Sequence, residues 1–512
     1  MSESILEPHS AVRATGSIKG AAGSVLDRSL FVGLGSTFIV VLALVIAAVL
    51  VGCAVGPDYA KPDTPVATTF ASAETTTYSS ADLQSRFWTQ FDDETLNRLV
   101  DDASDANHDL RIALGHLVEA RAARHEALFD FAPKVTASGG YTKQQVPLAA
   151  SPYGVGYVSE LYDAGFDASW ELDLFGRVRR ENEAARAELQ GAEANLHDAQ
   201  VSVIAEVVRT YFELRGEQNE LAVARRNVEN QQETLRVTDA RLNAGRGTEL
   251  DTSRAQAQLS TTLSSIAPLE AAVSRSIHRL GVLTGRDPNA LTDLLSPPQE
   301  LPGLPQIAAI GDPAALLRRR PDIRVAERQL AASTAQIGVA VGDLFPKVTF
   351  TGSFGYMSND TATLGQAATR SYAIGPGISW AAFDLGRVRA RIAGARAHTD
   401  VALAGYEQTV LRALEETENS LVTHARARDR LRNADDAARA SATAARIARA
   451  RYDGGIVDFL EVLDAERTQL QAEDQLAQSR TDAITSLVAV YKALGGGWEA
   501  TPPPRYTQAA NR

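Results

Sequence analysis

Three carboxylates follow one another at a spacing of three residues in the C-terminal part of the chain. The segment DFLEVLD (458–464) contains Asp458, Glu461 and Asp464. Residues three apart lie close together on one face of a helix, so a helix here would carry the three carboxylates side by side. Grouped carboxylates attract cations and repel one another, which is the chemistry of a cation-selective constriction. The alternative is a solvated acidic turn that stabilises the positive end of a helix dipole.

No other group of residues has a spacing that suits chemistry. The eight histidines are scattered, and the closest pair, His108 and His116, lacks the spacing of zinc ligands. The sequence contains no glycine-rich phosphate loop and no grouping of Ser, His and Asp typical of a hydrolase. We therefore expect no enzymatic activity, no metal site and no cofactor other than a covalent lipid.

The lipid is expected on Cys53, the only cysteine of the 512 residues. Arg28 and an apolar run from Phe38 to Val51 precede it, which is typical of a cleaved secretory signal. The alternative is a membrane anchor with an incidental cysteine, although this run is short for a spanning helix. The tetrapeptide LVGC (50–53) resembles the lipobox of bacterial lipoproteins. That resemblance implies that Cys53 becomes the lipid-bearing N-terminus of the mature chain.

The composition excludes nucleic acid as a general partner. The chain carries 51 Lys and Arg against 63 Asp and Glu, for a net charge of -12. A nucleic-acid binder neutralises phosphates with clustered basic residues, so this balance argues against that class of protein. With 45% hydrophobic residues, the chain is also unlike a disordered one, and its length suffices for several domains.

Three motifs occur twice. They are FAPKVTASGGY (131–141) and LFPKVTFTGSFGY (344–356), SWELDLFGRVR (169–179) and SWAAFDLGRVR (379–389), and RLNAGRGTELD (241–251) and RYDGGIVDFLE (451–461). The last two pairs are both offset by 210 residues. The chain therefore contains two copies of one structural unit. We expect a signal peptide (1–52), an extended lipidated segment (53–95), copy one (96–286), a Pro-rich linker (287–311), copy two (312–494) and a tail (495–512).

Each copy is expected to contain the same elements in the same order. In copy one, Asp92 or Asp93 can cap a helix that runs to about Phe131, before Pro133. Two strands, a long helix and a return helix follow. We place them at about 135–143, 164–172, 177–243 and 249–285 in copy one, and at about 348–356, 372–380, 387–453 and 457–494 in copy two.

The predicted strands have one apolar face and one polar face, as the wall of a transmembrane β-barrel has. Soluble half-buried strands alternate too. Trp170, Trp380 and Tyr141 lie near strand ends, as an interfacial aromatic girdle does, and a tryptophan of a soluble core is the alternative. Four strands cannot close a barrel, and lipid does not tolerate an open sheet edge. The missing strands must therefore come from other subunits, and the smallest closed solutions are a dimer with eight strands or a trimer with twelve.

The long helices are too long to stay in a membrane. Apolar residues recur every seven positions along the first one, which predicts a coiled-coil seam. About 67 residues at about 1.5 Å each give roughly 100 Å, several times the apolar thickness of a bilayer. The helix before the strands and the return helix are each about half as long, so both fit end to end beside the long helix. The seam residues are Val207, Leu214, Leu221, Val228, Leu235 and Leu242.

Several of these segments resemble the TolC/OprM family of outer-membrane efflux factors, in its lipidated, NodT-type branch. They are RRRPDIRVAERQLAASTAQIGVAVGDLFPKVTFTGSFGY (318–356), SWAAFDLGRVR, RYDGGIVDFLEVLDAERTQLQAEDQLAQS (451–479) and VYKALGGGW (490–498). The resemblance covers nearly everything from Cys53 to Trp498. It implies a mainly α fold with a membrane β-barrel portion: a homotrimer with a twelve-stranded barrel in the outer membrane and an α-barrel of long coiled-coil helices in the periplasm.

The resemblance also implies a function and partners. Such a trimer is the passive exit duct of a tripartite multidrug-resistance pump, anchored by its lipid in the outer membrane and extending into the periplasm. A periplasmic membrane-fusion adaptor and an inner-membrane resistance-nodulation-division transporter are its expected partners, and drugs or other small toxic compounds are its cargo. A periplasmic coiled-coil adaptor is the competing class, but it would lack the paired membrane strands. Within the channel class, protein secretion is the alternative to efflux.

By the same resemblance, DFLEVLD lies at a periplasmic aperture formed by Asp458, Leu460, Glu461 and Asp464. The family often has a small or hydroxyl residue where this chain has Phe459.

Copy one carries a basic residue at the matching position. Arg254 corresponds to Asp464 at the offset of 210, and Asp251 corresponds to Glu461. We expect Arg254, or its neighbour Arg246, to bridge to the aperture acids and to help hold the tube shut. The tips of the helix pairs are expected to contact the adaptor through Gly245, Gly247, Leu250, Gly454 and Gly455.

Overall fold

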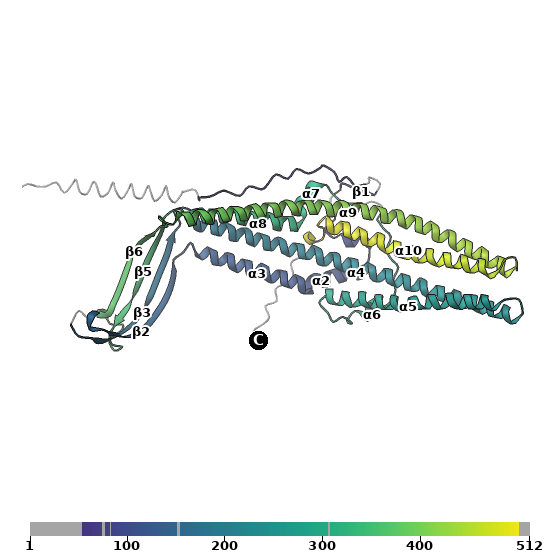
Figure 1. The fold of residues 1–512 in the computed structure, drawn as a ribbon, viewed down its shortest axis with the longest axis horizontal. Coiled ribbons are helices and arrows are strands. Elements are labelled where there is room, and N and C mark those ends of the chain that lie inside the picture. The colour runs from purple at the N-terminus through teal and green to yellow at the C-terminus, as the bar shows by residue number, and fades with distance from the viewer. Residues whose placement is uncertain (1–53, 74–76, 82, 151–153, 306–307, 501–512) are drawn as a thin grey trace, which may run out of the picture. The chain divides into compact units, whose positions relative to one another are not determined.

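The computed structural model describes residues 54–73, 77–81, 83–150, 154–305 and 308–500. These residues belong to one unit, shown in Figure 1. The predicted signal peptide and Cys53 lie outside the described residues, as does the end of the tail from residue 501 onward.

One four-stranded antiparallel sheet lies at one end of the helices (Figure 1). Its order is β2 (Lys134–Val146), β3 (Tyr157–Leu172), β5 (Lys347–Ser358) and β6 (Arg370–Ser379). The first hairpin is longer than predicted, because pairing continues as far as Val146 opposite Tyr157. The outer part of β2, from Thr142 to Gln145, is polar on both faces, and Lys143 there pairs with Glu160 at 2.6 Å, so this part of the strand has no apolar alternation to reveal it.

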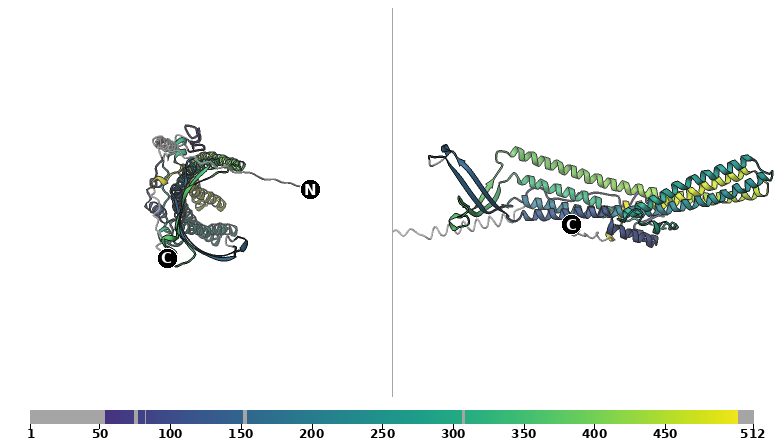
Figure 2. Two further views of the ribbon diagram at one scale, coloured as in Figure 1. Left: turned by 90° about the vertical axis from the view of Figure 1, so that its left-hand side faces the viewer. Right: turned by 90° about the horizontal axis from the view of Figure 1, so that it is seen from below.

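The sheet has one apolar face that nothing in the described chain covers. Phe166 on β3 lies opposite Phe354 on β5, and Phe354 lies opposite Tyr372 on β6. These three side chains are 59%, 49% and 72% exposed. Asp167 on the other face lies opposite Ser353. The left view of Figure 2 shows the sheet curving into an open arc, and β2 and β6 have no further partner among the described strands.

The long and return helices lie close to where the sequence places them. Helix α4 spans Arg177–Asn243 and α9 spans Leu385–Asp453, while the return helices are α5 (Glu249–Leu283) and α10 (Phe459–Ala493). Their turns form because Gly245 and Gly455 adopt φ of 71° and 69°, a conformation that glycine tolerates best. No helix in the described part of the chain is both long and apolar enough to cross a membrane.

The single helix predicted before the strands of copy one is wrong, because it is divided in two. Helix α2 (Glu94–Ala106) begins at Asp93, whose side chain accepts the N–H of Leu96. Helix α3 (His108–Phe129) then starts afresh at Asn107. The Asn107 side chain accepts the N–H groups of the new first turn and donates to the carbonyl of Leu283 on α5 at 2.8 Å. A side-chain cap thus replaces the helical bonds at this point.

Copy two is divided at the equivalent point by a different residue. Helix α7 spans Pro313–Arg319 and α8 spans Pro321–Gly342. Arg320 between them is extended, with φ -65° and ψ 120°, as the residue before a proline prefers. As Figure 1 shows, α3 and α5 follow one another beside α4, and α8 and α10 do so beside α9.

The core lies where these helices meet halfway along the long ones. The seam residues Val207 and Leu214 are fully buried there, together with Trp88 of the N-terminal segment. The linker joins this core through α6 (Thr292–Leu295) and through strand β4 (Ala308–Ala309), which pairs with β1 (Tyr78–Ser79). The N-terminal segment and the linker therefore hold the two copies together, with the sheet at one end and the helix tips at the other.

Candidate functional site

The predicted aperture lies at the start of α10, at the helix tips. Leu460, Glu461 and Asp464 point outward, and Leu460 is 51% exposed. Asp458 is not part of this helical face, so the prediction of three aligned carboxylates is wrong for that residue. It precedes the helix with ψ of 170° and accepts the N–H of Glu461 at 3.3 Å, as an N-cap residue does.

The opposite face of α10 packs into a small apolar cluster. Phe459 and Val462 are buried beside Tyr452 of α9 and Ala255 of α5. The rings of Tyr452 and Phe459 are 5.8 Å apart. The bulky residue at position 459 therefore points away from the exposed acids and helps to join the two helix pairs. The outward face of α10 is left to Leu460, Glu461 and Asp464.

Two arginines at equivalent positions of the repeat hold this tip. Arg241 on α4 lies 3.8 Å from the ring centroid of Tyr452 and donates to the carbonyl oxygen of that residue at 2.8 Å. Its counterpart in copy two, Arg451, pairs with Glu461 at 3.6 Å. Arg241 thus links copy one to copy two, and Arg451 partly neutralises Glu461 within its own helix pair.

The predicted lock residues contact none of the aperture acids within one chain. Arg246 is exposed and Arg254 is half-buried, and in the described residues neither forms an ion pair with Glu461 or Asp464. Asp251 has a local role, because its carboxylate accepts the N–H and the hydroxyl of Thr248 at 3.1 and 2.7 Å. That reciprocal cap starts α5.

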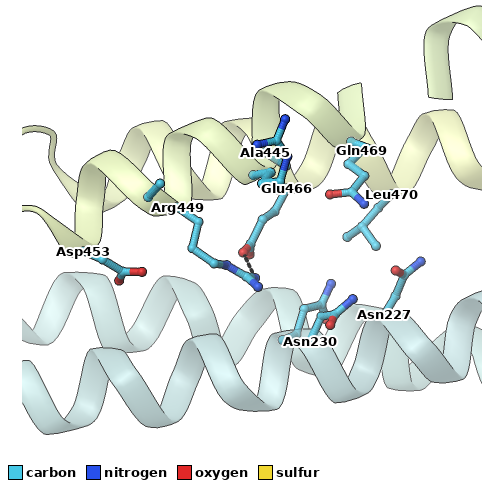
Figure 3. Close-up of a pocket in the computed structure, with 12 residues that line it drawn as sticks. Asn227, Asn230, Ala445, Arg449, Asp453, Glu466, Gln469 and Leu470 are labelled. Atoms are coloured by element: carbon cyan, nitrogen blue, oxygen red, sulfur yellow. Dashed lines mark hydrogen bonds and ion pairs between the residues drawn. The ribbon is translucent and has the colours of Figure 1, made fainter. Parts of the chain in front are cut away.

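A second link between the copies lies one turn further from the tip. Arg449 of α9 pairs with Glu466 of α10, and both contact the hydroxyl of Thr234 on α4. Figure 3 shows the pair at the wall of a polar pocket between α4 and the helices of copy two. Glu466 is buried, so this pair is shielded from salt more than the exposed ion pairs are.

Burial and neighbouring acids also change the pKa of Glu220, a residue of α4. They raise the pKa of Glu220 to about 7, burial contributing most, and Asp474, Glu217 and Asp482 following. Glu220 of α4 therefore exchanges a proton near neutral pH.

The two tips share one groove. Its lining includes Gly245, Gly247, Gly454 and Gly455. Leu250 is 56% exposed on the neighbouring first turn of α5. Gly454 has a helical φ of -73°, so the reversal in copy two depends on Gly455. The tip residues predicted from the sequence are therefore brought together at one end of the molecule.

Tryptophans occupy equivalent places where the sheet meets the helices. The indole N–H of Trp170 donates to the carbonyl oxygen of Phe131 at 3.0 Å, and that of Trp380 donates to Leu344 at 2.9 Å. Both side chains are exposed, at 37% and 54%, so neither belongs to the core of this chain. Both lie at or just beyond a strand end, where the sequence predicts an interfacial girdle.

A sequence model described as outer membrane efflux protein matches residues 99–286 and 313–496, once on each copy. The chain belongs to this family. Outer membrane protein OprJ of Pseudomonas aeruginosa is 33% identical to it over 465 residues, which are 90% of this chain and 96% of OprJ. The solvent efflux pump outer membrane protein SrpC of Pseudomonas putida is 30% identical over 458 residues, 88% of this chain and 96% of SrpC.

Solved channels show the same fold. The outer-membrane channel OprN superposes with a TM-score of 0.82 at 46% identity, covering 87% of this chain and 100% of that one. The open-state MtrE outer membrane channel of Neisseria gonorrhoeae gives a TM-score of 0.74 at 28% identity, covering 87% of this chain and 99% of that one. The efflux protein therefore has the predicted TolC-like fold, and it is an outer-membrane component of an efflux pump. Its role is transport.

Sequence reasoning missed the residues that join the helix pairs of the efflux protein. Arg241 and Arg451 correspond to one another at the offset of 210, so the repeat contained a signal for both. No comparable signal existed for Arg449 and Glu466, because their partner Thr234 is more than 200 residues away in sequence.

Proposed function

We propose that three copies of this efflux protein close one channel. The observation that carries the proposal is the sheet: within the described parts of the chain, its edges at β2 and β6 are unpaired and its apolar face is uncovered. In lipid, each backbone edge needs a partner, so β6 of one copy pairs with β2 of the next. The family resemblance favours three copies, and hence twelve strands, over two.

The assembled channel is a passive exit duct. Small toxic compounds, drugs among them, enter at the helix tips and leave through the barrel. An inner-membrane transporter of the resistance-nodulation-division class supplies the energy, and a periplasmic adaptor joins it to the tips. The exposed Leu250 and Leu460 beside Gly245, Gly247, Gly454 and Gly455 support an adaptor contact there, because apolar side chains at a solvent-facing turn mark partner surfaces. Acylation of Cys53 anchors the mature chain in the outer membrane.

The aperture is a ring of carboxylates from three copies of Glu461 and Asp464. Because like charges repel, the closed ring needs cations beside it. Arg451 is one such cation, and Arg254 or Arg246 of a neighbouring subunit is the second.

Removing the acids tests the aperture. We expect Glu461→Ala with Asp464→Ala to raise the conductance of the purified channel in planar bilayers, because the ion pairs that hold the tips together are lost. The control is Asp435→Ala with Asp436→Ala, which removes the same charge from the α9 pairs with Arg439. Unchanged conductance of the aperture variant would refute the assignment of Glu461 and Asp464 to the aperture.

A further inference from the structure

Arg180 lies in the first turn of α4, and only 4% of its side chain is exposed. Its Nε donates to the carbonyl oxygen of Val55 at 3.1 Å. Its Nη2 donates to the carbonyls of Gly56 and Ala54 at 3.3 and 3.5 Å, and pairs with Asp58 at 2.7 Å. One guanidinium therefore contacts four of the first five residues of the described chain. Charged donors on backbone carbonyls make strong hydrogen bonds where water is excluded.

The backbone around Arg180 fits this segment closely. Gly56 has a φ of +92°, and a Cβ there would lie 2.5 Å from the Cα of Gly338. A Cβ on Gly338 would lie 2.6 Å from Cγ of Arg180, and one on Gly176 would lie 2.5 Å from the Cα of Ala54. The absence of side chains at these glycines lets the N-terminal segment, α4 and α8 approach one another.

The repeat shows that the site is particular to copy one. Both copies share the motif GRVR at the start of their long helices. At the offset of 210, copy two has Ala390 in place of Arg180 and Ala393 in place of Glu183. Glu183 also pairs with Arg180, at 2.7 Å. The arginine and its acidic partner therefore occur only in copy one, although the N-terminal segment contacts both copies, as where Tyr59 donates to Glu327 of copy two at 3.1 Å.

The site is located where the sheet joins the helices. The N–H of Val55 donates to the carbonyl oxygen of Phe175 at 3.1 Å. Phe175 follows the end of β3 by three residues and stacks on Phe345 at 4.6 Å. Trp170 lies at the same end of β3. Tryptophans at this level mark the membrane interface of a barrel, so the segment is held at the periplasmic rim.

We propose that Arg180 is the docking site of the mature N-terminus, which fixes the lipid-bearing end of the chain at the rim of the barrel. The lipid rests on the acylation of Cys53 proposed above, whereas the docking of residues 54–58 does not. A docked segment gives the lipid no free linker. Once released, five residues would extend by up to roughly 17 Å, and the attachment point would no longer be fixed relative to the strands.

Hydrogen exchange of the full-length channel in detergent tests the docking. We expect Arg180→Met to speed exchange in a peptide covering 54–62 by about tenfold or more. Without the hydrogen bonds of Arg180, local opening of this segment has fewer bonds to break and therefore occurs more often. Gly338→Ala should have the same effect by displacing the arginine. Asp58→Asn is the milder variant, since that side chain is 90% exposed, and it should speed exchange by a smaller factor. Arg209→Met is the control, because among the described residues Arg209 bonds only Glu206 and Glu213 of its own helix.

A Cys53→Ser channel separates docking from acylation. We expect its 54–62 peptide to stay as protected as in the wild type. Mass spectrometry of the wild-type N-terminal peptide reports the acyl group independently, so an unmodified Cys53 would refute the lipid anchor and leave the docking standing. Wild-type protection of 54–62 in both Arg180→Met and Gly338→Ala would overturn the docking site.

Discussion

Among single residues, His424 makes the clearest prediction about pH. It is 2% exposed on α9 and bonds the hydroxyl of Ser486 at 3.1 Å. Burial, and then the charge of Arg428, lower the pKa of His424 from 6.5 to about 4. The unfolded chain therefore takes up this proton at a higher pH than the folded chain does. The stability contributed by the neutral ring is complete above about pH 6.5 and is lost as pH falls toward 4, by roughly 3 kcal/mol.

Replacing this histidine should remove that part of the acid sensitivity. We expect the thermal midpoint of His424→Gln to fall less between pH 7 and pH 4 than the thermal midpoint of the wild type does. Circular dichroism at each pH measures both midpoints. His398→Gln on the exposed face of the same helix is the matched control and should behave as the wild type does. An identical pH slope in the wild type and His424→Gln would contradict the assignment.

At the level of elements, the break between α2 and α3 depends on one side chain. Asn107 is 3% exposed, caps α3 and bonds the carbonyl of Leu283. Asn107→Ala removes the cap and leaves a buried carbonyl without this donor. It should therefore cost about 2–3 kcal/mol and lower the thermal midpoint of the channel. Asn230→Ala, at an exposed position inside α4, should change it little. Equal midpoints for the two variants would show that Asn107 does not hold this junction.

At the level of the whole molecule, the two faces of the sheet meet different surroundings. Ile374 and Ala373 are neighbours on β6 and point to opposite faces, Ile374 to the apolar one. We expect Ile374→Arg to prevent assembly, because arginine on a lipid-facing strand costs about 2–4 kcal/mol near the bilayer centre, and three copies would carry it. Ala373→Arg should assemble and change the ion selectivity of the pore. Native mass spectrometry of membrane extracts and bilayer recordings distinguish the two, and equal assembly of both would refute the face assignment.

The sequence by itself determined the elements whose causes are local. Apolar residues every seven positions and a glycine just beyond the last turn mark α4 and its end at Asn243, because a helix seam and a left-handed cap depend on neighbours a few residues apart. The period-2 alternation of 164–172 likewise marked the inner part of β3. The repeat showed that each element occurs twice, and the motifs identified the family.

Only the tertiary structure decided which side chains of the two copies meet. Asn107 divides a helix because Leu283, 176 residues away, offers a carbonyl there. Arg241 reaches Tyr452 across 211 residues, and Arg180 reaches Asp58 across 122. Asp458 does not lie on the predicted acidic face, because it caps the start of α10, where the free N–H groups need an acceptor. Such contacts depend on how helix faces pack, and the periodicity of one helix does not specify the partner of each face.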